Sequence, residues 1–283
     1  MRVHVALTPA DASGLALGGS AAMVVDVLRA TTTVVTACAA GCDRVVPVAD
    51  PVVARERAGS FPPDEVLLAG EQGGEPIPGF DLGNSPLEFT ADRVGGKTIF
   101  LTTTNGTAAM LSAAAASTAA VAALTNVSAS ARWALDARRD LVVLCSGDDG
   151  AFSIEDAVCA GLVVVRLSAA GADLSDGALA ALGLGRFYAP RLGDLRHASR
   201  WARRLARMGR SEDVEACLRL DVVDVVPVVE AGAIVPGPGL ARAEGGRAAR
   251  SRRELDGAAR TPPPGARRGG SPEAQPSSGD LAR

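Results

Sequence analysis

Two kinds of segment alternate along the first 240 residues of this 283-residue chain. Short apolar runs rich in β-branched residues predict strands that are buried on both faces. Ala-rich segments of helical length lie between them and predict helices at residues 31–40, 50–58, 105–116, 127–138 and 153–169. The alternation predicts an α/β protein, a layered α/β/α structure with a largely parallel (mixed) sheet. The predicted strands are RVHVAL, AMVVDVL, RVVPVA, EVLLAG, KTIFLTT, AAVAAL, LVVLCSG and VVDVVPVV.

Two segments repeat the same order of features. VVDVLRATTTVVTACAAG and VVLCSGDDGAFSIEDAVCAG each run from a strand through a polar turn to a helix, a Cys-Ala pair and a glycine. An internal duplication with a boundary near residue 125 explains this order, and shared composition explains it equally well.

The last part of the chain has a different composition. From residue 241 onward there are nine arginines against five acidic residues, a net charge of +4, and only two leucines among the large aliphatic residues. Such a segment cannot bury enough apolar surface to offset the entropy of ordering. We therefore expect a catalytic region at residues 1–238 and a disordered Arg/Pro/Gly-rich tail at residues 239–283. A basic arm that binds nucleic acid is the alternative for the tail.

Composition also narrows the classes of partner. Aromatic residues make up 3% of the chain, too few for the stacking platforms of single-stranded nucleic-acid binding. No apolar run reaches transmembrane length and no signal peptide is recognisable, so we expect no membrane contact and a cytoplasmic location. The five cysteines are odd in number and form no C-x-x-C pair, which favours buried thiols. The sequence leaves open whether the chain forms a homodimer.

Polar residues gather where the predicted strands end, which is where open α/β sheets bind ligands. We expect these strand ends to share one edge of the sheet. Carboxylates suit Mg²⁺, and an arginine suits phosphate or carboxylate. The residues concerned are Asp26, Arg29 and Thr31–Thr33; Glu71; Thr102–Gly106; Asn126; and Cys145, Ser146, Gly147, Glu155 and Asp156.

This inventory favours a metal-dependent reaction of a phosphate ester, and known phosphatase signatures restrict its mechanism. Leu28 stands where an aspartyl-phosphate enzyme needs a second Asp after Asp26, and Ala151 stands where a cysteine phosphatase needs Arg after Cys145. The chain has neither a Gly-x-x-x-x-Gly-Lys-Ser/Thr loop nor a Gly-x-Ser-x-Gly elbow. Of the mechanisms considered, attack on the phosphate ester by metal-activated water remains.

Four stretches in this order, VVDVLRATTT, GEQGGEPIPGFDLGNSPLEF, TTTNGT and CSGDDGAFSIEDAVCAG, resemble the 2-phosphosulfolactate phosphatase family of coenzyme M biosynthesis. The resemblance covers roughly residues 1–236 and implies an α/β fold of two similar, intertwined halves. It implies Mg²⁺-dependent hydrolysis of (2R)-2-phospho-3-sulfolactate, a small phosphorylated 2-hydroxy acid, to 3-sulfolactate and phosphate. Gln72 departs from the pattern, which has Arg there. A sensor that binds a phosphorylated or sulfonated acid without turnover is the alternative.

The resemblance also implies roles for individual residues, with the Gly/Pro-rich loop from Glu71 to Pro86 as a wall of the active site. Catalytic roles fall to Asp26, Arg29, Glu71, Asn105 and Cys145. Substrate-binding roles fall to Arg29, Thr31, Asn84, Ser85, Thr103, Thr104, Asn105, Gly106 and Gly147. Metal-binding roles fall to Asp26, Glu71, Asp81, Glu155 and Asp156.

Overall fold

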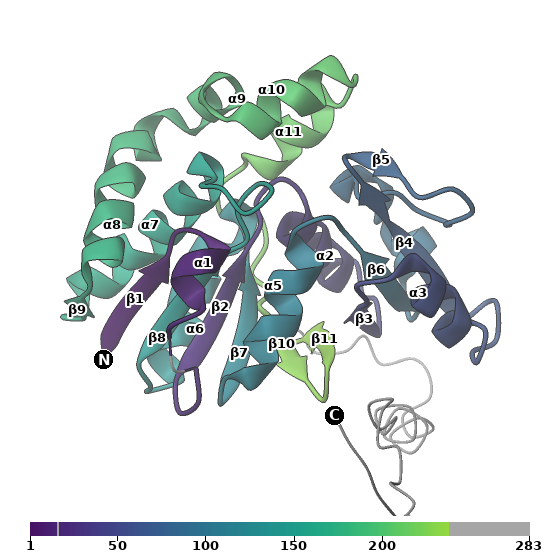
Figure 1. The fold of residues 1–283 in the computed structure, drawn as a ribbon, viewed down its shortest axis with the longest axis horizontal. Coiled ribbons are helices and arrows are strands. Elements are labelled where there is room, and N and C mark those ends of the chain that lie inside the picture. The colour runs from purple at the N-terminus through teal and green to yellow at the C-terminus, as the bar shows by residue number, and fades with distance from the viewer. Residues whose placement is uncertain (16, 238–283) are drawn as a thin grey trace, which may run out of the picture. The chain divides into compact units, whose positions relative to one another are not determined.

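The strands pair in one mixed sheet in the computed structural model, which describes residues 1–15 and 17–237 (Figure 1). In this part of the chain the strands are β1 (Arg2–Ala6), β2 (Ala21–Val25), β3 (Arg44–Pro47), β4 (Val66–Gln72), β5 (Glu75–Pro76), β6 (Thr98–Thr102), β7 (Thr118–Ala122), β8 (Leu141–Cys145), β9 (Asp173–Leu174), β10 (Pro227–Glu230) and β11 (Ala233–Pro236). Their order across the sheet is β5-β4-β6-β3-β11-β10-β7-β2-β8-β1-β9. The mostly parallel pairing confirms the predicted α/β class.

The sheet consists of two parallel groups joined by an antiparallel hairpin. Strands β4, β6 and β3 form one group, and β7, β2, β8, β1 and β9 form the other. The β10–β11 hairpin pairs antiparallel with each group through one residue pair, Val228 with Ala120 and Ile234 with Val45. The groups therefore run in opposite directions, and the expectation that all strand ends share one edge is wrong.

Helices cover both faces of the sheet. They are α1 (Pro9–Ala12), α2 (Ala30–Ala39), α3 (Pro51–Ala58), α4 (Ala91–Val94), α5 (Gly106–Ser112), α6 (Val127–Asp136), α7 (Ile154–Ala169), α8 (Asp176–Tyr188), α9 (Leu195–Ala198), α10 (Arg200–Arg207) and α11 (Ser211–Cys217). Met23 and Val25 of β2 pack in one core with α6, α7 and α8, while Ala22 and Val24 pack in another with α2 and α5. A smaller core joins α3 to β3 and β6. The alternation along β2 places it at the centre of three layers.

Local signals set several helix boundaries where the sequence places them. The Ser153 side chain accepts a hydrogen bond from the backbone N–H of Asp156, which caps α7, and Glu155 and Asp156 lie in its first turn. The Asp50 side chain accepts from Val52 N, and Pro51 begins α3. These caps satisfy amide groups that the helix itself leaves free. All five predicted helices occur, and VVDVVPVV forms a strand only from Pro227 onward.

The sequence pattern made no prediction for residues 170–221, which hold α8 to α11. Strands β5, β9 and β11 and the helices α1 and α4 were also missed. Seven of these nine elements have seven residues or fewer, and short elements carry too few residues for a periodic signal. The helices α9, α10 and α11 follow one another above the carboxyl end of β2 (Figure 1). The unpredicted segment thus supplies a helical cap, defined here as residues 195–217.

Strands from the two sides of residue 125 interleave. Strand β8 lies between β1 and β2, and the β10–β11 hairpin lies between β3 and β7. The two segments with the same order of features, β2–α2 and β8–α7, have β2 and β8 as parallel neighbours. This interleaving agrees with the intertwined halves, while similarity between the halves stays a prediction.

The predicted tail at residues 239–283 lies outside the described residues. Within the described part of the chain, no helix has both the length and the apolar character needed to cross a bilayer.

Candidate active site

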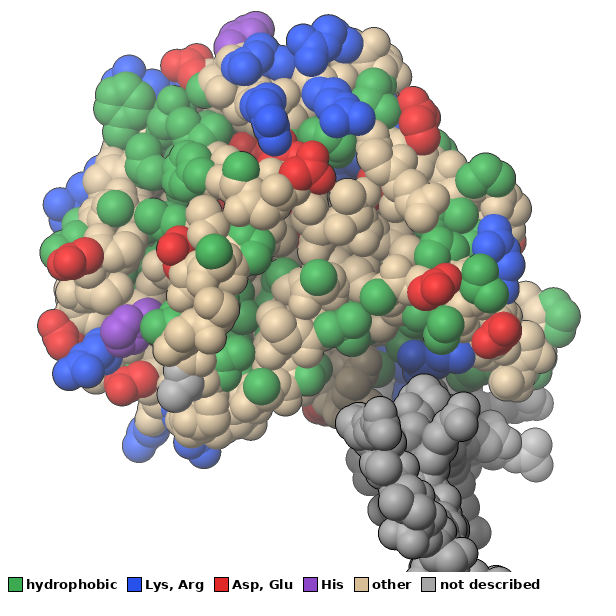
Figure 2. Space-filling view, in the orientation of Figure 1, with side chains coloured by type: hydrophobic (Ala, Val, Ile, Leu, Met, Phe, Trp, Pro, Cys, Tyr) green, Lys and Arg blue, Asp and Glu red, His purple; other side chains and the backbone are tan. Residues whose placement is uncertain are grey.

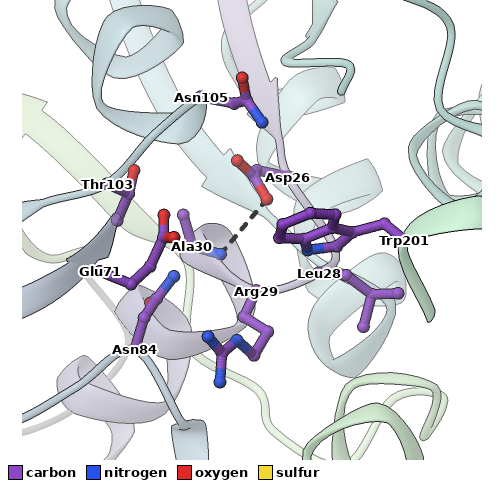
Figure 3. Close-up of a pocket in the computed structure, with 9 residues that line it drawn as sticks. All are labelled: Asp26, Leu28, Arg29, Ala30, Glu71, Asn84, Thr103, Asn105 and Trp201. Atoms are coloured by element: carbon purple, nitrogen blue, oxygen red, sulfur yellow. Dashed lines mark hydrogen bonds between the residues drawn. The ribbon is translucent and has the colours of Figure 1, made fainter. Parts of the chain in front are cut away.

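A small polar pocket lies where the chain leaves β2, β4 and β6 (Figure 3). Figure 3 shows the carboxylates of Asp26 and Glu71 and the Asn105 amide around one space, with the Trp201 ring on another side. The ends of both parallel groups therefore meet here, even though the groups run in opposite directions. The pocket is lined by Asp26, Leu28, Arg29, Ala30, Glu71, Asn84, Thr103, Asn105 and Trp201.

Asp26 follows β2 directly and is held by the first turn of α2. Its Oδ1 accepts a hydrogen bond from Ala30 N at 3.3 Å. The Thr31 hydroxyl donates to the Asp26 carbonyl at 2.8 Å and accepts from the Asp26 N–H at 3.0 Å. Thr31 is fully buried, so the structure assigns it to holding the Asp26 backbone and not to the pocket wall.

The pKa of Asp26 is raised from an ordinary 3.8 to about 7, mainly by burial and in smaller part by the charges of Glu71 and Glu155. The carboxyl is 6% exposed, and removal from water disfavours its charged form. Asp26 can therefore hold or release a proton close to neutral pH, which suits general acid–base work.

Glu71, at the end of β4, is fixed by hydrogen bonds from two segments. Its Oε2 accepts from Gly74 N at 2.6 Å, and its Oε1 accepts from Thr104 N at 2.7 Å. The Thr104 hydroxyl donates to Glu71 at 3.1 Å and accepts from Gly73 N at 3.0 Å. Thr104 is exposed and lies outside the pocket lining. It therefore orients Glu71.

Asn84 comes from the far end of the Gly/Pro-rich loop and carries an unsatisfied polar atom. Its side chain is buried and lines the pocket, and its Oδ1 has no hydrogen-bond partner among the residues that the structure describes. The Asn84 carbonyl accepts from the Thr33 hydroxyl at 3.0 Å, which fixes the backbone there. Because buried polar atoms are nearly always paired, this oxygen indicates a place for a bound group.

The start of α5 forms the third wall. The Thr103 hydroxyl accepts from Thr107 N at 2.9 Å, and the Thr107 hydroxyl accepts from Thr103 N at 2.8 Å. Gly106 lies against Asp26, because an added Cβ would be 2.6 Å from Asp26 Oδ2 and 2.4 Å from the Ala30 Cβ. Only glycine fits there. Asn105 lines the pocket, and its Oδ1 accepts from Asp149 N at 3.4 Å.

Arg29 lines the pocket with a side chain that is almost fully buried. Its Nη1 donates to Asp213 Oδ2 at 2.6 Å and its Nη2 donates to the Gly74 carbonyl at 2.9 Å. In Figure 3 the guanidinium points away from the Asp26 carboxylate. The cation is therefore paired with a residue outside the pocket lining, and within residues 1–15 and 17–237 Asp26 forms no ion pair with a basic side chain.

Acidic residues of α7 lie behind the pocket. Asp156 Oδ1 accepts from Val27 N at 2.8 Å, and its Oδ2 accepts from Gly147 N at 3.2 Å. Asp156 thus joins the turn after β8 to the turn after β2. Burial raises the pKa of Asp156 well above its usual range, with the charges of Asp26 and Glu155 adding to it. Burial also raises the pKa of Glu155. Neither residue lines the pocket.

Several residues with predicted roles lie elsewhere. Asp81 is exposed, and its Oδ2 accepts from Leu68 N at 2.8 Å, so it anchors the loop to β4. The Ser85 hydroxyl donates to Asp213 at 2.5 Å. Cys145 is buried, and burial together with the Asp156 charge raises the pKa of its thiol well above 9.0. A thiol held in its protonated form is a poor nucleophile. The Asn126 amide donates to the Val225 carbonyl at 2.9 Å.

The predicted metal ligands do not gather in one place. In the part of the chain that the structure describes, no three carboxylate, histidine or cysteine side chains come close enough to hold one ion. Two of the five predicted ligands, Asp26 and Glu71, share the pocket, and the Asn84 amide lines it beside them. Two carboxylates fit Mg²⁺, which often binds through one or two carboxylates and completes its shell with water and phosphate.

Sequence reasoning missed two residues of the site, both in the helical cap. Trp201 of α10 lines the pocket, and Asp213 of α11 pairs with Arg29. The chain has two tryptophans, so Trp201 in the segment SRWARRLAR was a signal that could have been followed. Nothing in the sequence distinguishes Asp213 from other acids in a first helical turn.

The cap also presents a basic face. Figure 2 shows arginines over α9 and α10 beside acidic side chains. Arg200, Arg203, Arg204 and Arg207 of α10 are all exposed. Arg204 stacks on the Trp201 ring at 4.8 Å, and its Nη2 donates to the Gly73 carbonyl at 3.4 Å. Gln72 is exposed in the β4–β5 hairpin beside Gly73. A cation therefore lies near the position where Gln72 departs from the expected arginine.

The fold and the pocket together are those of an α/β protein with carboxylates, an amide and an arginine at converging strand ends, where proteins of this fold class bind ligands. The family model for 2-phosphosulpholactate phosphatase matches residues 7–232. The chain belongs to this family.

Individual relatives agree with the family match. A Symbiobacterium thermophilum protein is 41% identical over 223 residues, which cover 77% of this chain and 95% of that protein. A Caldanaerobacter subterraneus protein is 39% identical over 213 residues, 75% of this chain and 88% of its own length. A Gloeobacter violaceus protein is 40% identical over 218 residues, 76% of this chain and 91% of its own length. Each is named a probable 2-phosphosulfolactate phosphatase.

Proposed function

We propose that the protein is a Mg²⁺-dependent phosphatase that hydrolyses the phosphate monoester of a small 2-hydroxy acid, (2R)-2-phospho-3-sulfolactate, to 3-sulfolactate and phosphate. The observation that carries the proposal is the pocket that Asp26, Glu71 and Asn84 line together with Arg29, in a chain of this family. The five cysteines are unpaired and buried, which supports a reducing, cytoplasmic location.

Asp26, Glu71 and Asn84 are the residues that would hold Mg²⁺. When bound, the ion supplies positive charge beside the phosphate and lowers the pKa of water. The pocket needs such a charge, because it contains two carboxylates and its arginine is already paired with Asp213. A phosphate dianion would otherwise meet net repulsion.

The chain's own groups divide the remaining work. A carboxylate oxygen of Asp26 that does not face the ion is placed to accept the proton of the attacking water, because Asp26 lines the pocket directly. Arg29 binds the phosphate with N–H donors that Asp213 and Gly74 do not use, because a guanidinium has more donors than these two contacts need. The Trp201 ring excludes water from one side.

The basic face of α10 supports an anionic substrate. Its four exposed arginines lie on the helix that carries Trp201 into the pocket. A substrate that carries a phosphate, a carboxylate and a sulfonate would be attracted toward this face before it binds. Such attraction weakens with salt over about 8 Å at physiological ionic strength.

A panel of phosphorylated 2-hydroxy acids, including 2-phospho-3-sulfolactate, tests the proposal by phosphate release with Mg²⁺ and with EDTA. We expect release from 2-phospho-3-sulfolactate with Mg²⁺ and none with EDTA. Asp26→Asn and Glu71→Gln should each lower turnover by about 100-fold or more. Asp221→Asn, which changes an Arg166-paired acid outside the pocket, is the control. Binding of the ester without phosphate release would contradict the proposal and favour a sensor.

A further inference from the structure

A buried carboxylate of the helical cap holds Arg29 from outside the pocket. Asp213 lies in the first turn of α11 and is 5% exposed. Its Oδ2 accepts from Arg29 Nη1 at 2.6 Å, and its Oδ1 accepts from the Ser85 hydroxyl at 2.5 Å. Asp213 thus joins the cap to the turn after β2 and to the end of the Gly/Pro-rich loop. It lies 184 residues from Arg29 and 128 residues from Ser85 in the sequence.

The Arg29 guanidinium is fixed at two nitrogens. Its second tie runs from Nη2 to the Gly74 carbonyl at 2.9 Å. The side chains of Arg29 and Asp213 are 2% and 7% exposed. If either side chain moved, the other would remain as a buried charge without its partner. A planar cation held in this way loses little further freedom when it meets a ligand.

The ion pair with Asp213 also determines the direction in which the Arg29 guanidinium points. Figure 3 shows the guanidinium turned away from the Asp26 carboxylate, and the ion pair with Asp213 keeps it there. If Arg29 paired with Asp26 instead, its charge would be neutralised by a group that has to take up a proton. The pairing with Asp213 separates the phosphate-binding cation from the proton-accepting carboxylate.

We propose that Asp213 is a positioning residue that holds the Arg29 guanidinium in the orientation that binds the substrate's phosphate, so that the helical cap completes the site. This inference rests on the proposed phosphatase function. A purely structural Asp213 would anchor α11, and its loss would change stability without acting through Arg29.

A double-mutant cycle separates these two roles. We would measure kcat and KM for phosphate release, and the melting-temperature shift caused by inorganic phosphate, for the wild type, Asp213→Asn, Arg29→Met and the double variant. We expect Asp213→Asn to lower kcat/KM by about tenfold or more, and the double variant to be no worse than Arg29→Met alone, because the first change acts through Arg29. Additive losses in the double variant would overturn the proposal.

Two further variants keep the test independent of folding. Asp213→Glu retains the carboxylate and should recover part of the activity lost in Asp213→Asn, whereas a role of shape alone predicts no recovery. Asp221→Asn removes a comparable acid from the Arg166 pair outside the pocket and should leave kcat/KM unchanged. If Asp213→Asn lost only stability while its folded fraction kept normal kcat and KM, the positioning role would be excluded.

Failure of the proposed function gives a different result from failure of this inference. If the wild type releases no phosphate from any ester, the phosphatase proposal fails, and the phosphate-induced melting shift then decides the role of Asp213. A shift that Asp213→Asn and Arg29→Met reduce non-additively supports positioning of Arg29 for an anion. A shift that Asp213→Asn leaves unchanged overturns it.

Discussion

Asp26 lies at the point where β2 ends, and its environment disfavours its own charge. Burial raises its pKa to about 7, and Glu71 and Glu155 add repulsion. The same environment that makes Asp26 a proton acceptor near neutral pH therefore lowers the stability of the folded protein when Asp26 ionises. A catalytic carboxyl with a raised pKa is therefore expected to lower the free energy of unfolding at neutral pH.

Asp26→Asn should change how stability depends on pH. The pKa of Asp26 in the folded protein is about 7, above the ordinary 3.8, so the folded state keeps this proton longer than the unfolded chain. The protonated Asp26 carboxyl therefore stabilises the folded state fully below about pH 4. This part of the free energy of unfolding, on the order of 4 kcal/mol, is lost as the pH rises through 7. Asp26→Asn should flatten this fall in stability, measured by urea denaturation between pH 4 and 8.

The exposed acid Asp64 provides the control, and Asp64→Asn should keep the wild-type pH dependence. An equal fall with pH in Asp26→Asn and the wild type would show that Asp26 ionises normally. Mg²⁺ should raise the melting temperature of the wild type more at pH 8 than at pH 5, because the carboxyl that would bind the ion is charged only at the higher pH.

Gly106 tests how closely the pocket is packed. The Cβ of Gly106→Ala would meet Ala30 and Asp26 at 2.4 and 2.6 Å, so we expect a loss of about 1–3 kcal/mol in stability and about tenfold or more in turnover. Gly183→Ala is the matched control, because this glycine lies inside α8 with no atom within 4 Å of an added Cβ. It should gain about 0.5–1 kcal/mol and keep full turnover. Normal turnover in Gly106→Ala would show that Asp26 tolerates displacement.

At the scale of elements, the site depends on the helical cap as much as on the sheet. Helix α10 is capped by the Ser199 hydroxyl, which accepts from Ala202 N at 2.9 Å. Ala202 and Leu205 are buried in the core shared with α7 and α8, and Trp201 lines the pocket. Packing of one face of α10 therefore determines where the indole lies.

Trp201 should report ligand binding through its fluorescence. Trp133→Phe leaves Trp201 as the single tryptophan, since the chain has two, and phosphate should then produce a saturable change in emission. Trp201→Phe leaves Trp133, which lies on α6 outside the pocket, and its emission should stay constant. A response carried by Trp133 instead would place the ligand elsewhere.

At the scale of the whole molecule, the β10–β11 hairpin joins the two parallel groups. Ile234 pairs with Val45 and is fully buried, and Val228 pairs with Ala120. Because only one backbone residue pair joins the hairpin to each group, side-chain packing of the hairpin carries much of the connection between them. The pocket needs this connection, since Asp26 follows one group and Glu71 ends a strand of the other.

Ile234→Ala should lower the free energy of unfolding by about 2–5 kcal/mol, because it leaves a cavity at this junction. Val222→Ala is the control, since Val222 is 48% exposed and its loss should stay within about 0.5 kcal/mol. Chemical denaturation followed by circular dichroism measures both. A loss in Ile234→Ala no larger than that in the control would show that the hairpin does not hold the groups together.

The sequence by itself determined most elements of the first 169 residues and much of the pocket. Apolar runs on both faces of a strand and capped Ala-rich helices are local signals, so the α/β class was predictable. The backbone of a residue near the end of a strand is positioned by that strand. One pocket is accordingly lined by Asp26, Arg29, Glu71, Thr103 and Asn105. Asn84 was found through the resemblance.

Only the tertiary structure decided the rest. Asp81 and Cys145 have the right chemistry, yet one side chain is exposed on the loop and the other is buried in the core. Trp201 and Asp213 reach the site through packing of the cap, with Asp213 lying 184 residues from Arg29. Local sequence fixes backbone periodicity over a few residues. The direction of a side chain beyond a loop, and the partner it meets, depend on contacts between distant segments that form only when the whole core packs.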